Sequence, residues 1–158
     1  MRRIFILVLV GMLLLSACGA PKSNTLEAAN FWARSGLKDG NSAAYLMLSN
    51  GTAQDDALIG ASSDVATAVE VHLSKMGDDG TMQMIPQESV ALPAGGELEL
   101  KPGSYHIMII GLVKDLNVGD EITLTLHFEN HEDITLTVPV KEAADMGGSG
   151  MDGHNTMP

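Results

Sequence analysis

The chain has 158 residues, of which 20 are acidic and 9 are basic, so its formal net charge at pH 7 is −11. This excess of negative charge argues against nucleic acid or an anionic membrane surface as a binding partner, because both repel an acidic protein. With one cysteine, the chain has no internal disulfide framework.

The N-terminal segment has the pattern of an export signal. Arg2 and Arg3 precede an apolar run from Ile4 to Leu15, which is shorter than the roughly 20 residues of a transmembrane helix. Such a segment is typical of a secretory signal peptide. The next letters, "LSAC", resemble a bacterial lipobox in which Cys18 is lipidated. We therefore predict a lipoprotein signal peptide over residues 1–17, with an ordinary secretory signal or an uncleaved anchor as alternatives.

Export would leave the folded part outside the cytoplasm, in an oxidising compartment, held to a membrane by a lipid anchor. Residues 18–24 are then a short linker from Cys18. Residues 25–143 are long enough for one domain with a hydrophobic core. Residues 144–158 are rich in glycine and lack a core pattern, which predicts a flexible tail. Without the signal peptide the formal net charge becomes −13.

Short strand patterns fill the predicted domain. Residues 25–34 are ambiguous and fit either a helical turn or a strand that begins at Phe31. Beyond them, apolar alternation and turn residues predict strands at Ser42–Asn50, Ala66–Met76, Thr81–Pro86, Glu97–Leu100, Tyr105–Gly111, Glu121–Phe128 and Ile134–Val140. The second and third should form a hairpin through "GDDG", and the last two should form another. Many short strands with regular turns indicate an all-β single domain, an antiparallel sandwich or barrel.

The strand in "KPGSYHIMIIG" carries two candidate metal ligands. Side chains alternate between the two faces of a strand, so His106 and Met108 share one face. Ile107 and Ile109 share the other face, which we expect to be the core face. We expect His106 at the protein surface, so that His106→Ala would leave the fold intact.

The predicted hairpin at residues 66–86 carries further candidates. His72 falls on the polar face of its strand, and the returning strand holds Met82 and Met84 on one face. Imidazole and thioether groups suit Cu(I), a soft ion. The absence of carboxylates from this set disfavours Ca²⁺ and Mg²⁺, and the absence of a thiolate disfavours zinc and blue-copper sites. A thioether also avoids the risk of thiolate oxidation.

The spacing of these residues resembles the H(M)x10Mx21HxM signature of the periplasmic PCuAC copper chaperones. Eleven residues separate His72 from Met84, and 21 separate Met84 from His106, which precedes Met108 by two positions. The stretches "AAYLMLSN", "VEVH", "MQMIP", "LPAGGELELKPGSYHIMIIGL" and "GDEITLTLHFE" are also similar to that family. The resemblance extends from Phe31 to Val140.

The resemblance implies a cupredoxin-like antiparallel β-sandwich or Greek-key barrel that binds one Cu(I) through His72, Met84, His106 and Met108. It implies a monomeric chaperone without catalytic activity. The acceptor would be the copper-bearing subunit of cytochrome c oxidase, with its dinuclear centre, or another copper-transfer protein. Leu73 stands in the optional methionine position, where we expect it to face the core.

Other functions and other ligands stay open. The alternatives are a lipoprotein for copper sequestration or resistance and a metal-free interaction lipoprotein with a β-sandwich. An enzyme is the weakest interpretation, because no nucleophile elbow or H-E-x-x-H motif is present. Met82 could replace or supplement Met84. Additional copper could bind in the tail, at Met146, Met151, His154 and Met157.

The remaining notable side chains have ordinary structural explanations. His127 and His131 lie on a polar face and in a turn, where we expect solvation. Met47 lies in an apolar strand and is expected in the core. We expect Trp32 and Tyr45 to be packing aromatics.

Overall fold

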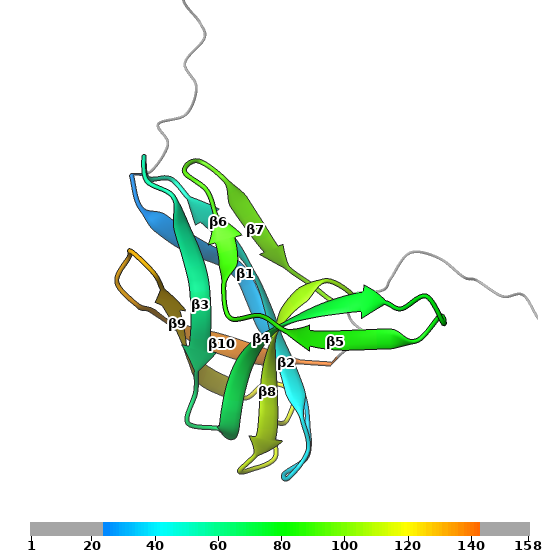
Figure 1. The fold of residues 1–158 in the computed structure, drawn as a ribbon. Coiled ribbons are helices and arrows are strands. Elements are labelled where there is room, and N and C mark those ends of the chain that lie inside the picture. The colour runs from blue at the N-terminus through cyan, green and yellow to red at the C-terminus, as the bar shows by residue number, and fades with distance from the viewer. Residues whose placement is uncertain (1–23, 143–158) are drawn as a thin grey trace, which may run out of the picture.

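The computed structural model describes residues 24–142, which form ten strands and no helix (Figure 1). The strands are β1 (Leu26–Arg34), β2 (Ser42–Asn50), β3 (Asp56–Ser62), β4 (Ala66–Met76), β5 (Met82–Pro86), β6 (Val90–Leu92), β7 (Glu97–Leu100), β8 (Tyr105–Leu112), β9 (Glu121–Phe128) and β10 (Ile134–Lys141). In this part of the chain no helix could span a membrane.

The strands pair in the order β5-β4-β8-β2-β1-β10-β9-β3-β6, and β7 pairs with β2. Every pair is antiparallel except β1 with β10, which is parallel. The path folds at the β1–β10 contact, so that β4, β8, β2 and β1 form one layer and β10, β9 and β3 form the other (Figure 1). The predicted all-β sandwich is confirmed.

The core lies between the two layers and follows the alternation of the strands. Ile107 and Ile109 of β8 and Val71 of β4 supply one inner face. Leu124 and Leu126 of β9 supply the opposite face, and all five side chains are almost fully buried. Burial of each aliphatic side chain contributes about 1.5–3 kcal/mol. The same alternation turns His72, His106 and Met108 to the outer face of the β4–β8–β2 layer.

Three differences from the sequence prediction concern strands. β1 begins at Leu26 rather than Phe31, and it holds an irregularity marked by Asn30 with φ of 54°. This kink breaks the alternation on which a strand prediction depends. The sequence pattern did not predict β3 or β6. β6 has three residues, too few for a pattern, and β3 contains a glycine and small side chains that weaken its strand signal.

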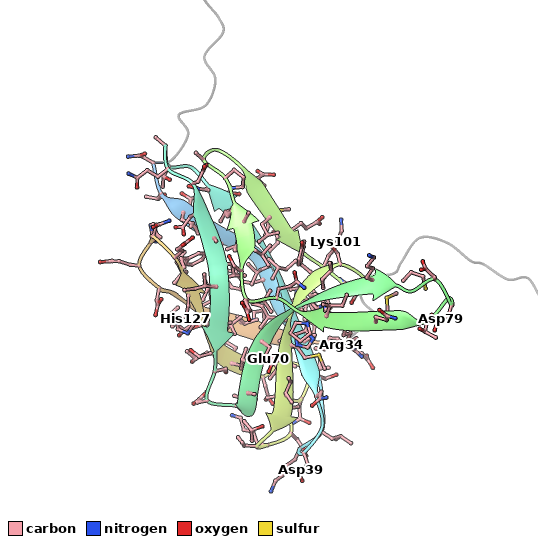
Figure 2. The ribbon with its side chains drawn as sticks, viewed as in Figure 1. Arg34, Asp39, Glu70, Asp79, Lys101 and His127 are labelled. Carbon is pink, nitrogen blue, oxygen red and sulfur yellow. The ribbon has the colours of Figure 1, made fainter. Side chains whose placement is uncertain are left out.

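The β4–β5 hairpin extends beyond the body of the sandwich (Figure 1). Pairing of β4 with β8 ends at Leu73, whereas pairing with β5 continues to Met76. All five residues of β5 are exposed. At the hairpin tip, labelled in Figure 2, Asp79 accepts hydrogen bonds from the backbone and hydroxyl of Thr81 at 3.0 and 2.7 Å. The side-chain bond from Thr81, with the backbone bond second, lowers the pKa of Asp79. The outer half of the hairpin is therefore a two-stranded ribbon with an ordered turn.

One glycine allows β8 to lie close against β4. Gly111 has φ of 65°, and a Cβ atom there would lie 2.4 Å from the hydroxyl oxygen of Thr67. That hydroxyl donates a 2.9 Å hydrogen bond to the carbonyl of Ile110. Both the backbone conformation and the close approach thus require glycine.

We predict that Gly111→Ala lowers the free energy of unfolding clearly more than Gly103→Ala does. Gly103 also has positive φ, at 78°, but a Cβ atom there would meet nothing within 4 Å. The control should therefore cost only the backbone strain, about 1–2 kcal/mol. Urea denaturation of both variants measures the difference, and equal costs would contradict the proposed steric role of Thr67.

Candidate metal centre

Two histidines lie directly opposite each other on neighbouring strands. His72 of β4 and His106 of β8 are cross-strand partners, and their ring centroids are 6.0 Å apart. Both residues are buried, with exposed fractions of 7% and 4%. The expectation that His106 lies at the surface is therefore wrong. Tyr45 lies on the neighbouring strand β2, with its ring centroid 6.4 Å from that of His106.

Hydrogen bonding fixes which nitrogen of each ring can bind a metal. In His72, Nε2 donates to a carboxylate oxygen of Glu70 at 2.7 Å, which leaves the lone pair on Nδ1. That Nδ1 atom is buried and has no hydrogen-bond partner within the described residues. In His106, Nδ1 donates to the carbonyl oxygen of Ser104 at 3.0 Å, which leaves the lone pair on Nε2.

This arrangement is typical of metal ligands. A histidine that binds a metal almost always donates its other N–H group to a carboxylate or a backbone carbonyl. Here one ring uses each kind of acceptor. A buried nitrogen without a partner, such as Nδ1 of His72, costs about 1–3 kcal/mol unless something binds it. The donor set thus fits a metal ion that accepts neutral imidazole.

Methionines complete the surroundings of the two rings. A hollow of about 280 Å³ is lined by His106 together with Met82, Met84 and Met108. Met108 is half-buried, and Met84 is 54% exposed. His72 does not line this hollow but lies beside His106. The structure thus brings three of the four predicted ligands to one hollow and the fourth next to them.

Strand register distinguishes Met84 from Met82. Met84 is opposite Ser74, two residues along β4 from His72, whereas Met82 is opposite Met76, four residues along. At about 3.3 Å per residue these offsets are roughly 7 and 13 Å. Met84 is therefore the nearer of the two to the pair of histidines.

Several predictions lie outside the described residues. These include the signal peptide, the lipidation of Cys18, and the possible tail ligands Met146, Met151, His154 and Met157. The predicted domain boundaries likewise stay predictions. Within residues 24–142, no three His, Cys, Asp or Glu side chains form a cluster that could hold a metal.

Residues 26–140 match the family described as "Putative lipoprotein LpqE-like". The chain belongs to this LpqE-like lipoprotein family. Lipoprotein Lxx21020 of Leifsonia xyli subsp. xyli is 26% identical over 121 residues, covering 77% of this chain and 72% of that one. Protein RP573 of Rickettsia prowazekii is 33% identical over 114 residues, which cover 69% of this chain and 62% of the Rickettsia protein.

Solved structures with the same fold are PCuAC domains. The copper-bound PCuAC domain of PmoF2 has a TM-score of 0.63 at 22% identity, covering 74% of this chain and 92% of that one. The solution structure of CuI-DR1885 from Deinococcus radiodurans has a TM-score of 0.57 at 27% identity, covering 79% and 87%. The LpqE-like chain therefore has a PCuAC-like fold, as its sequence motif predicted.

The sequence pattern of this LpqE-like chain did not identify the residues that orient the two histidines. Glu70 precedes His72 by two positions on the same strand face, and that spacing was the available signal. Ser104 contributes through its backbone carbonyl, so no side-chain pattern could identify it. Trp32 and Tyr45 are packing aromatics, as predicted, with ring centroids 4.6 Å apart. Met47 is half-buried rather than a core residue.

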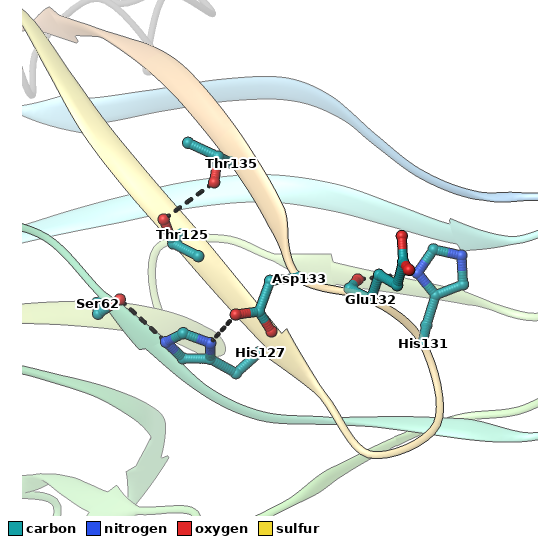
Figure 3. Close-up of polar contacts among 7 residues, drawn as sticks. All are labelled: Ser62, Thr125, His127, His131, Glu132, Asp133 and Thr135. Atoms are coloured by element: carbon teal, nitrogen blue, oxygen red, sulfur yellow. Dashed lines mark hydrogen bonds and ion pairs between the residues drawn. The ribbon is translucent and has the colours of Figure 1, made fainter.

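A second polar arrangement lies on the other layer (Figure 3). His127 of β9 contacts the hydroxyl of Ser62 through Nε2 and the carboxylate of Asp133 through Nδ1, each at 2.9 Å. The chain of contacts from serine to histidine to aspartate resembles a catalytic triad. However, Ser62 and Asp133 are exposed, whereas the carboxylate of such a triad is buried. We assign it a structural role, because it connects β3, β9 and the turn before β10. His127 is thus bonded within the protein as well as partly solvated.

We predict that His127→Ala lowers the free energy of unfolding by about 1 kcal/mol, since two partly exposed hydrogen bonds are lost. Cu(I) binding should be unchanged, because His127 is on the layer opposite the candidate centre. Urea denaturation and a copper titration of the same variant test both parts. A loss of copper affinity would contradict the assignment.

Proposed function

We propose that this LpqE-like lipoprotein binds one Cu(I) ion through His72, Met84, His106 and Met108 and transfers it to another protein. The observation that carries the proposal is the buried pair of imidazoles, each with one N–H group hydrogen-bonded, together with Nδ1 of His72, which has no partner among the described residues. Neutral imidazole and thioether ligands suit Cu(I). The hollow beside His106, which Met84 and Met108 also line, provides the thioether ligands.

Similarity to copper proteins supports the choice of metal. The relative from Deinococcus radiodurans, at 27% identity, was solved with Cu(I). The PCuAC domain of PmoF2 was solved with copper, although at 22% identity that likeness supports the fold rather than the ligand. The spacing of the four proposed ligands in this chain, which matches the PCuAC copper signature, supports copper as the metal that this fold binds here.

The exposure of one ligand, Met84, supports transfer rather than permanent storage, although His72 and His106 are buried. Met84 lies on an exposed ribbon and is 54% accessible, so an acceptor protein could approach the ion directly. A set of neutral ligands also binds Cu(I) without a thiolate, which permits exchange.

We further propose where the protein is located and which protein accepts the ion. The family is described as a lipoprotein family, and the predicted lipobox agrees with an extracytoplasmic domain anchored to a membrane. We propose as acceptor the copper-bearing subunit of cytochrome c oxidase or another copper-transfer protein. Sequestration would instead be favoured if several ions bound tightly and none passed to an apo-acceptor.

The first test is an anaerobic titration of Cu(I) against a chromophoric Cu(I) chelator. We expect one tightly bound ion per chain, with affinity reduced at least tenfold in Met108→Leu and Met84→Leu. Leucine conserves volume, so these variants should fold, whereas His106→Ala would also open a cavity in a buried site. Met47→Leu is the matched control and should bind as the parent does. A parent chain that cannot compete with the chelator would refute the proposal.

A second test concerns the orientation of His72. Replacement of Glu70 by Gln removes the charged acceptor that holds Nε2–H, so Nδ1 is no longer fixed as the free nitrogen. We expect Glu70→Gln to lower Cu(I) affinity about 10–100-fold, the usual effect of losing such a partner. Glu97→Gln, on β7, makes the same change in net charge and should leave the affinity unaltered. If both variants lowered the affinity equally, the effect would come from the change in net charge and not from the orientation of His72.

A further inference from the structure

The outer half of the β4–β5 hairpin carries methionines on one face. Met76 and Met82 are direct cross-strand partners and are 58% and 52% exposed. Met84 is the next residue along β5 on that face. The opposite face of the same segment has the polar pair Lys75 and Gln83. The ribbon therefore has one polar face and one face of thioethers.

Burial does not explain these methionines. β4 continues past its last partner in β8 at Leu73, so no third strand covers the outer part of the ribbon within the described residues. Large apolar side chains gathered on an exposed surface mark a site of interaction more often than chance. What distinguishes this group chemically is sulfur, which is a soft ligand for Cu(I).

We propose that Met76 and Met82, assisted by Met84, form a second and weaker Cu(I) site through which the ion enters and leaves the histidine centre. This inference deepens the proposed function and rests on it. Directly opposite residues in a sheet have Cβ atoms about 4.5–5.5 Å apart. Methionine side chains are flexible, so two sulfur atoms can approach one ion from the two strands.

Met84 connects the two sites. It lines the same hollow as Met82, His106 and Met108. An ion moves inward when its bond to the sulfur of Met82 breaks and a bond to an imidazole nitrogen forms, while Met84 stays bound. Copper remains Cu(I), one thioether bond breaks as one imidazole bond forms, and the thioether carries no proton to release. Because the hairpin site is the more exposed, an entering ion meets it before the histidine centre and a departing ion leaves from it, whereas at equilibrium the tighter histidine centre fills first.

The experiment uses the chain from Gly19 to Pro158 with methionines labelled as ¹³C-methyl groups. Cu(I) is added anaerobically, and single Met→Leu variants assign each resonance. At one equivalent of Cu(I), we expect the methyl resonances of Met84 and Met108 to shift. With further Cu(I), we expect Met76 and Met82 to shift together while Met47 stays unchanged.

The outcomes separate this inference from the proposed function. If Met84 and Met108 do not shift at one equivalent, the proposed function fails. If they shift but Met76 and Met82 do not respond to further Cu(I), the hairpin site is refuted and the proposed function stands. The hairpin site is likewise refuted if further Cu(I) shifts only the tail methionines Met146, Met151 and Met157.

A kinetic variant tests the role in transfer. The double change Met76→Leu with Met82→Leu keeps the apolar character of the ribbon and removes both sulfur atoms. We expect it to retain the first bound ion but to release it to a chelator at least fivefold more slowly than the parent, with Met47→Leu as the control. Unchanged release, which an apolar docking face without a metal role would give, overturns the proposed route.

Discussion

The register of β4 against β8 is the constraint on which the candidate centre depends. It sets His72 directly opposite His106, and alternation then turns both rings to the same face of the sheet. A slip of one residue would exchange these imidazoles for the aliphatic side chains that fill the core. The close approach at Gly111, where β8 passes Thr67, lies at the far end of the same pair of strands.

The core and the candidate centre impose opposite demands on β8. Ile107 and Ile109 stabilise the fold by burial, while His106, between Tyr105 and Ile107 in sequence, is buried on the other face as a polar group. Burial of an imidazole is tolerated because one N–H is satisfied locally, by Glu70 or by Ser104. The remaining nitrogen of His72 has no such partner among the described residues. The apo protein thus carries an energetic cost that a bound metal ion would remove, which couples ligand binding to stability.

Sequence patterns predicted most of the strands, because alternation along β8, β9 and β10 is regular and the turns contain glycine, proline and asparagine. The patterns did not predict a strand where the alternation was interrupted or the strand was too short. The kink at Asn30 concealed the start of β1, and β6 is too short for a pattern. The identities of the candidate ligands followed from spacing, whereas the burial of His106 did not. Alternation assigns a face but does not reveal that Tyr45 lies near His106 on that face, because the two residues are far apart in the sequence.

The exposure of the β4–β5 hairpin makes its methionines accessible to oxidants, which matters most if the domain lies outside the cytoplasm, as its predicted export signal indicates. Methionine sulfur that an acceptor can reach can also be reached by oxidants, which convert it to a polar sulfoxide. Among the described residues no methionine or cysteine is fully buried in the core, whereas Met76, Met82 and Met84 of the hairpin are all more than half exposed. Among these residues, oxidation would therefore reach the hairpin methionines before any side chain that stabilises the fold. A folding assay would therefore not detect oxidation of these methionines. If the protein carries copper as proposed, an oxidised chain would stay correctly folded but bind the ion less well, and enzymatic reduction of the sulfoxides would be needed to restore binding.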